Sequence, residues 1–295
     1  MRKGMILAVV GSMLWGLSGT ISQYLFTHYQ VATLWLTAFR LLTAGAILSA
    51  SGLVRQGRQA LSVFASRRDR VALVIFALAG LLTCQYSYLN AIRCSNSATA
   101  AVMQYLAPLY ILLYGCLAAG RRPHADETLC IVMALAGVFL LATHGRLGSM
   151  VLSSQGLLWG FLAGVTACLY QTLPYKLMRT HGSLPIIGWG MLIAGAVLAL
   201  AGRVWTIWPT LDATGWLCVA GIVLIGTVGG YGLYLTGVTA IGPMTASLVS
   251  AVEPLTATVV MCLWLATPLA AMDWLGLGLI MATVLILNRP AARRS

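Results

Sequence analysis

The sequence predicts an all-α integral membrane protein of ten transmembrane helices, arranged as two inverted five-helix repeats. Hydrophobic residues make up 60% of the chain and charged residues 8%, whereas a soluble domain carries about a quarter charged residues. Nearly every segment is apolar and long enough to cross a bilayer. The chain also repeats itself at a constant offset of 146 residues: Tyr88-Leu89, Thr99-Ala100 and Pro108-Leu109 recur as Tyr234-Leu235, Thr245-Ala246 and Pro254-Leu255.

The repeat sets the expected domain organisation, with a first unit over residues 1–144 and a second over residues 155–288. Leu14-Trp15-Gly16 returns in the second unit as Leu158-Trp159-Gly160. A unit with an odd number of spans begins and ends on opposite sides of the bilayer, so its twin is inverted. Inverted repeats are common in alternating-access transporters.

The ten predicted spans each approach the roughly 20 residues that a membrane helix needs. In chain order they cover residues 4–26, 32–53, 69–90, 96–118, 126–144, 155–178, 184–203, 213–238, 243–265 and 271–288. The first follows Arg2-Lys3 as a signal peptide would. It is longer than the apolar region of a typical signal peptide and lacks a clear cleavage site, so we expect it to span the membrane.

The placement of basic residues predicts the orientation. With the N-terminus inside, 14 of the 18 Lys and Arg residues fall on the cytoplasmic side, against Arg93, Arg146 and Arg203 outside. This imbalance favours a multi-pass protein of the cytoplasmic (inner) membrane with both termini in the cytoplasm. The net charge of +12 is scattered over short loops, so we interpret it as a topology signal and expect no nucleic-acid partner.

Glu253 is the one acidic residue predicted deep in a span, since the other five lie near predicted helix starts, where carboxylates cap helices. It lies about 15 Å into its span, near the midplane, where an ionised side chain costs on the order of 3 kcal/mol. It therefore needs a partner or a watery cavity, and Arg40 is the oppositely charged residue within a predicted span. Three interpretations stay open: an Arg40–Glu253 ion pair, a substrate cavity in which Glu253 binds a cationic group or a proton, or a protonated, hydrogen-bonded Glu253.

Pro254 and its repeat partner Pro108 are predicted to kink their helices. A proline within a helix frees the carbonyl four residues earlier, here those of Ser250 and Gln104. Broken helices at matching positions of two repeats point to a binding site between them. The alternative is that both prolines only shape helix packing.

Other polar and aromatic residues within the spans are candidates for the same site. With Glu253 and Arg40, the predicted substrate-binding set consists of Trp15, Gln85, Gln104, Tyr105, Tyr170 and Tyr231. Tyr86, Tyr88, Gln171 and Tyr234 lie in the same spans and are further candidates to line this cavity. For each of these residues, a role in helix packing is an equally good interpretation. The seven cysteines and four histidines show no metal-ligand spacing, so no metal site is predicted.

In their joint order, these features resemble a known family. Ten spans in two inverted halves, Arg40 in the second span, Trp-Gly in the first and sixth, and Glu253-Pro254-Leu255 in the ninth are similar to the drug/metabolite transporter superfamily, and more narrowly to its EamA branch. The resemblance implies a basket-shaped bundle around a central cavity and transport of small metabolites, most often export of amino acids or related compounds. One similar branch imports choline through an aromatic cage, in which a quaternary ammonium lies over ring faces.

We therefore expect a secondary transporter of small polar metabolites that works by alternating access and favours export. Uptake of choline or another quaternary amine is the alternative. An enzyme is not expected, because only one carboxylate lies mid-membrane and the histidines are peripheral. No nucleotide-binding motif and no cofactor are predicted, and proton coupling through Glu253 stays open. The expected partners are a small-molecule substrate and the lipid bilayer, and the sequence does not predict an oligomeric state.

Overall fold

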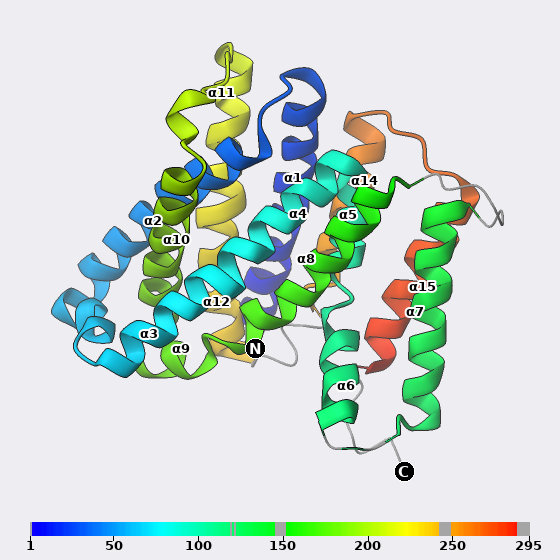
Figure 1. Ribbon diagram of the computed structural model, residues 1–295, viewed down its shortest axis with the longest axis horizontal. Coiled ribbons are helices and arrows are strands. Elements are labelled where there is room, and N and C mark those ends of the chain that lie inside the picture. The colour runs from blue at the N-terminus through cyan, green and yellow to red at the C-terminus, as the bar shows by residue number, and fades with distance from the viewer. Residues whose placement is uncertain (1, 119, 121, 145–151, 242–248, 288–295) are drawn as a thin grey trace.

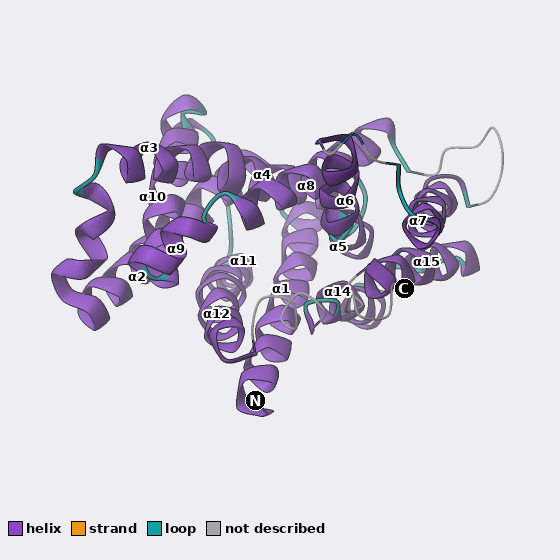
Figure 2. Ribbon diagram, turned by 90° about the horizontal axis from the view of Figure 1, so that it is seen from below, coloured by secondary structure: helices purple, strands orange, loops and turns teal. Residues whose placement is uncertain are grey.

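The computed structural model describes residues 2–118, 120, 122–144, 152–241 and 249–287, and all regular elements within these ranges are helical (Figures 1 and 2). The α-helices are α1 (Arg2–His28), α2 (Thr33–Gln56), α3 (Arg67–Ile75), α4 (Thr83–Cys94), α5 (Ser97–Gln104), α6 (Ala107–Ala118), α7 (Ala125–Thr143), α8 (Ser154–Thr172), α9 (Tyr175–His181), α10 (Ser183–Ala201), α11 (Ala213–Ala220), α12 (Gly230–Ile241), α14 (Val252–Trp264) and α15 (Ala271–Leu287). Two short 3₁₀ segments are η1 (Gly57–Phe64) and η3 (Val204–Thr206), and two π-helical segments are η2 (Phe76–Leu82) and η4 (Gly221–Gly229). The repeated dipeptide Thr245-Ala246 and the predicted outer residue Arg146 lie outside the described residues.

Within the described ranges, six helical stretches are long and apolar enough to cross a membrane, which confirms a multi-helix membrane protein. They are Arg2–His28, Thr33–Phe64, Arg67–Cys94, Ala125–Thr143, Ser183–Ala201 and Ala213–Val238. A seventh is formed if Ser154–Tyr170 and Tyr175–His181, which meet at a 41° bend, make one span. Val252–Trp264 and Ala271–Thr283 are apolar but shorter. The predicted fourth span is divided into α5 and α6.

The two repeat-related prolines each lie in the first turn of a helix, where proline is well tolerated. Pro108 follows the turn that separates α5 from α6, and Pro254 follows the turn before α14. The expectation that Pro254 frees the Ser250 carbonyl is wrong, because that oxygen accepts a hydrogen bond of 2.9 Å from the Glu253 amide. The chain therefore breaks at matching places in the two halves, but as turns between helices and not as kinks within one helix.

Helices from the two halves pack against one another in a reciprocal pattern. The first predicted span (α1) packs against the eighth (η4 and α12), and the third (η2 and α4) packs against the sixth (α8). Likewise α2 packs on α10, and α7 packs on α15 at one side of the molecule (Figure 1). Exchanging the two halves turns the first of these pairs into the second, and it returns the α2–α10 and α7–α15 pairs to themselves.

The connection after α1 is tied to the start of α11 by Tyr29 and Asp212, both outside the spanning helices. Asp212 Oδ1 accepts hydrogen bonds from the Tyr29 hydroxyl at 2.6 Å and from the Gly215 amide at 2.8 Å. The hydrogen bond from Tyr29 is the main reason that the pKa of Asp212 lies below its ordinary value. The same hydrogen bond raises the pKa of Tyr29 to about 12.

Replacing Tyr29 by phenylalanine is expected to make the protein unfold at a higher pH on acidification. The Asp212 pKa is depressed in the folded state, so its contribution to stability is present above the unfolded carboxyl pKa and is lost as pH falls through the folded value. Removing the Tyr29 hydroxyl brings the folded-state pKa of Asp212 closer to its unfolded-state pKa, so Asp212 contributes less to stability. Acid unfolding in detergent, followed by tryptophan fluorescence, measures the effect, with the exposed Tyr114→Phe as control. Identical unfolding curves for wild type and Tyr29→Phe would contradict the conclusion that the Tyr29 hydrogen bond lowers the pKa of Asp212.

Candidate functional site

All eight residues predicted to bind substrate line one central cavity of about 110 Å³. On a water-probe scale, one water needs about 10–15 Å³, so the cavity has room for several waters or a small solute. The eight residues come from seven parts of the chain: Trp15 (α1), Arg40 (α2), Gln85 (α4), Gln104 and Tyr105 (the end of α5 and the turn after it), Tyr170 (α8), Tyr231 (α12) and Glu253 (α14). Their convergence is a feature of the structure, whereas their binding of substrate stays a prediction.

Arg40 is the positively charged residue of this cavity, and a hydrogen bond from one nitrogen of its guanidinium group holds it in place. Its Nε donates a 2.8 Å hydrogen bond to Thr227 Oγ1, and the side chain is only 5% exposed. Thr227 lies in η4, and its hydroxyl in turn donates at 2.8 Å to the carbonyl of Ile222, five residues earlier, as the π-helical turn allows. Among the described residues, no hydrogen-bond partner lies in range of the two terminal nitrogens of Arg40, which leaves its planar fork available for a carboxylate.

Glu253 is the carboxylate of the cavity and stands in the first turn of α14. No ion pair within 4.0 Å joins it to Arg40, although the structure describes both residues. Its backbone is packed directly against α1, because a Cβ on Gly16 would lie 2.5 Å from the Glu253 carbonyl oxygen. The cavity thus holds two opposite charges that do not neutralise each other by direct contact, and this disfavours the interpretation as a structural ion pair.

Gln85 and Tyr231 join the two halves across the cavity. Gln85 Nε2 donates a 2.9 Å hydrogen bond to the Tyr231 hydroxyl, and the two residues are 146 positions apart. That separation is the repeat offset, so each occupies the position of the other in its own half.

Aromatic rings form one wall of the cavity around Tyr231. The ring of Trp15 lies 5.0 Å from that of Tyr231 and 4.7 Å from that of Tyr234, and Tyr170 lies 6.3 Å from Tyr231 on the other side. Tyr86 does not line this cavity and instead packs its ring edge-on against Trp159 at 5.6 Å.

Three further polar residues line the cavity: Ser18 and Cys84, which were not predicted, and Tyr88, which was a candidate outside the predicted substrate-binding set. Gln104 Nε2 lies 3.2 Å from Cys84 Sγ, a weak acceptor that a solute could replace. Ser18 gave no signal, since a span tolerates serine wherever its hydroxyl bonds within the helix, as Ser22 does with the Ser18 carbonyl at 2.8 Å. Tyr88 carried a signal, because it is conspicuous within its span.

The groups of this cavity are suited to recognition of a small solute. A small solute that carries both a carboxylate and an amine can be bound by the groups present here. They are the terminal nitrogens of the Arg40 guanidinium, a carboxylate, two amide side chains and aromatic ring faces. Among the described residues, no three His, Cys, Asp or Glu side chains are gathered closely enough to hold a metal ion.

Comparison with known proteins places this architecture among membrane transporters. The EamA-like transporter family matches residues 2–143 and 154–289 of the chain. A protein of Salmonella typhimurium named "Uncharacterized inner membrane transporter YicL" is 36% identical over 298 residues, covering 100% of this chain and 98% of that protein. Solute carrier family 35 member B1 of Bos taurus is 24% identical over 238 residues, covering 72% and 69% of the two chains. A solved crystal structure of a protein is similar in fold, with a TM-score of 0.63 and 19% identity over 97% of this chain and 96% of that chain.

Proposed function

Because the chain belongs to the EamA-like transporter family, we propose that it is a secondary transporter that moves amino acids or related small polar metabolites across the cytoplasmic membrane by alternating access. The predicted resemblance to the EamA branch is confirmed. Export is the direction we favour, as the resemblance implies. The name of the Salmonella relative supports the inner membrane as the location.

The observation that carries this proposal is the pair of separated charges in the central cavity. Arg40 offers an unpaired fork on α2, and Glu253 offers a carboxylate on α14. In a low-dielectric interior, such groups are retained only where a ligand, a proton or water compensates them. An amino-acid zwitterion supplies both counter-charges at once, with its carboxylate at Arg40 and its amine at Glu253. In the absence of substrate, a proton on Glu253 could take the place of the amine, which is how we propose that proton coupling arises.

Several paired features support the finer architecture, ten helices in two inverted repeats over residues 1–144 and 155–288. The two π-helical segments η2 and η4 occupy matching places in the two halves, as do the turns before Pro108 and Pro254. The reciprocal helix pairs and the Gln85–Tyr231 hydrogen bond fit a two-fold axis through the cavity. With this arrangement we propose that both termini face the cytoplasm, as the basic residues predict.

Counterflow in proteoliposomes with a panel of labelled amino acids and choline tests the function. We expect exchange of at least one small amino acid by wild type, and an approximately 10- to 100-fold loss in Arg40→Lys, because a lysine cannot reproduce a bidentate contact with a carboxylate. Exchange of choline with no amino acid exchange would replace this proposal by the predicted alternative, a quaternary-amine importer. Absence of exchange for the whole panel would refute both.

A further inference from the structure

Three buried polar atoms along the central cavity have no hydrogen-bond partner, and each of their side chains contacts a glycine of a neighbouring helix. They are Trp15 Nε1, Ser18 Oγ and the Tyr88 hydroxyl. A Cβ on Gly230 would lie 2.6 Å from Trp15 Nε1, and a Cβ on Gly19 would lie 2.7 Å from the Tyr88 hydroxyl. A Cβ on Gly226 would overlap the side chain of Ser18.

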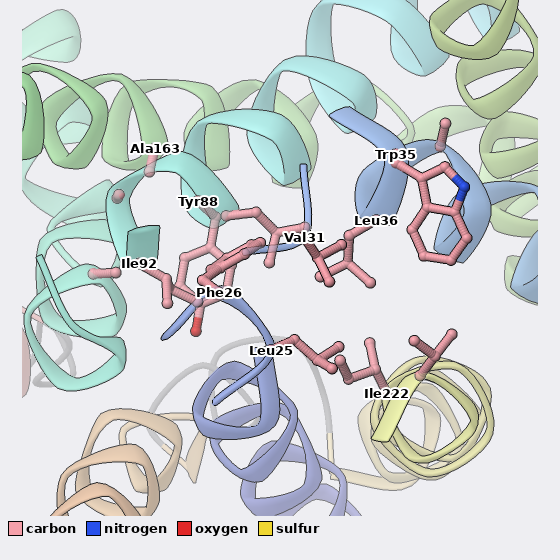
Figure 3. Close-up of a cluster of buried hydrophobic side chains, with 14 of the residues drawn as sticks. Leu25, Phe26, Val31, Trp35, Leu36, Tyr88, Ile92, Ala163 and Ile222 are labelled. Carbon is pink, nitrogen blue, oxygen red and sulfur yellow. The ribbon is translucent and has the colours of Figure 1, made fainter. Parts of the chain in front are cut away.

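All three contacts lie between α1 and its neighbours on one side. Trp15 and Ser18 point from α1 at glycines of α12 and η4, and Tyr88 points from α4 at a glycine of α1. Figure 3 shows the Tyr88 side chain in the cluster that also contains Phe26 and Ile92. A buried hydroxyl without a partner costs about 1–3 kcal/mol. Glycines let these helices approach closely, so the three contacts rest on packing and not on side-chain hydrogen bonds.

On its other side, α1 makes polar and aromatic side-chain contacts with α14 and α5. Thr20 Oγ1 lies 3.3 Å from two carbonyl oxygens that can accept its proton, that of Ala257 in α14 and that of Gly16 in its own helix, and 3.2 Å from Ser97 Oγ of α5. The rings of Tyr24 and Trp264 stack at 5.2 Å between α1 and α14. Helix α1 and helix α14, which carries Glu253, are therefore joined as one unit.

The helices on the far side of these glycine contacts, α2, α4, η4 and α12, form a second unit. Arg40 joins α2 to η4 through Thr227, and Gln85 joins α4 to α12 through Tyr231. Arg40 therefore belongs to the second unit and Glu253 to the first. At the outer end of α1, the Tyr29–Asp212 hydrogen bond holds the two units together, so relative motion is greatest toward the inner end.

We infer that α1 moves relative to η4, α12 and α4 during the transport cycle, and we call the interface between them the slip boundary. This boundary crosses the cavity between Arg40 and Glu253. In the other conformation of the cycle, Ser18 and Tyr88 gain hydrogen-bond partners. This inference rests on the proposed alternating-access function. Thr227 and Gly16 act as positioning residues, because each fixes one of the two charges to its own side of the boundary. A zwitterion that bridges the charges binds both units at once, whereas a ligand of single charge holds only one.

The distance distribution between two nitroxide labels tests the boundary without any ligand. Labels at the exposed positions Lys3 and Gln59 report on α1 against the second unit, and labels at Lys3 and Leu263 report on α1 against α14. Attaching them to genetically encoded ketone side chains leaves the seven native cysteines in place. Double electron–electron resonance then gives the population of each conformation.

We expect Tyr88→Phe and Ser18→Ala each to raise the ratio of the population with the Lys3–Gln59 distance of this structure to the other population by about tenfold, because each removes a hydroxyl that only the other conformation satisfies. Ser22→Ala is the matched control, since the Ser22 hydroxyl is bonded within α1 in any conformation, and it should leave the populations unchanged. The Lys3–Leu263 distance should stay constant in every variant.

The inference is overturned if neither Tyr88→Phe nor Ser18→Ala shifts the Lys3–Gln59 populations, or if the Lys3–Leu263 distance changes with them. Having two variants protects the test against one that fails to fold. Counterflow of the same labelled samples separates this outcome from failure of the proposed function. Intact exchange with unshifted populations refutes the slip boundary alone.

Discussion

Glutamine at position 253 is expected to lower amino-acid counterflow by about 100-fold. The substitution keeps the size and hydrogen-bonding capacity of the side chain but removes the negative charge of the cavity. The substrate ammonium would then enter a site whose remaining charge is the Arg40 guanidinium. Leaving one member of a buried charge pair without its counter-charge costs about 2–5 kcal/mol, and the lower part of that range corresponds to the expected loss.

The pH dependence of the remaining transport distinguishes amine binding from proton coupling by Glu253. If Glu253 also carries the coupling proton, Glu253→Gln should exchange substrate with a flattened pH profile and should not accumulate it against a gradient. Glu127→Gln is a suitable control, because Glu127 is also buried but serves to cap α7 by accepting from the His124 amide at 2.8 Å. A glutamine oxygen preserves that hydrogen bond, so transport should be retained. Wild-type rates with an unchanged pH profile in Glu253→Gln would remove this residue from the mechanism.

The cavity residues could be predicted because polar groups within a span have few acceptable positions. Arg40 and Glu253 are far from any predicted loop, so each had to face protein or water and not lipid. The same reasoning applies to Gln85 and Gln104, and the structure brings all four to one cavity. The inference needed no knowledge of helix packing, since a cavity within the helix bundle is an environment that suits all of them.

The helix breaks and the π-helical segments could be predicted only in part. The repeated prolines gave the places of the breaks, but whether a proline kinks a helix or begins a new one depends on the preceding turn, here Tyr105-Leu106 in the first half. The segments η2 and η4 each contain a wider helical turn, which leaves no mark on a pattern that is apolar all round. The position of Thr227 toward Arg40 depends on that turn, so this contact could not be predicted from the sequence.

The partners of individual side chains were the least predictable feature. Nothing in the sequence distinguishes Ser18, which has no partner, from Ser22, which bonds within its own helix. The difference arises from the rotation of α1, which directs Ser18 at Gly226 of η4. Such details depend on packing between segments about 200 residues apart, for which local pattern carries no information.

Gly16→Ala is expected to destabilise the protein by about 2 kcal/mol, because overpacking a tight contact costs about 1–3 kcal/mol. The same substitution is expected to abolish counterflow. A Cβ there would lie 2.5 Å from the Glu253 carbonyl oxygen and 2.9 Å from the Ala257 amide nitrogen. Both atoms belong to the backbone of α14, so the clash is relieved only by moving that helix away from α1. Because Glu253 moves with it, the distance across the cavity to Arg40 changes as well.

The repeat supplies a matched control at Gly160, which occupies the corresponding position of the second half. A Cβ on Gly160 would meet the side chain of Met103, including its sulfur and terminal methyl group, and not a backbone atom. Methionine is flexible and can turn aside, so Gly160→Ala should cost less than about 1 kcal/mol and keep most of the transport. Thermal unfolding in detergent and counterflow, measured on both variants, test the difference. Equal effects at the two positions would mean that the contact between α1 and the Glu253 backbone does not position the carboxylate, and Gly16 would then be an ordinary packing glycine.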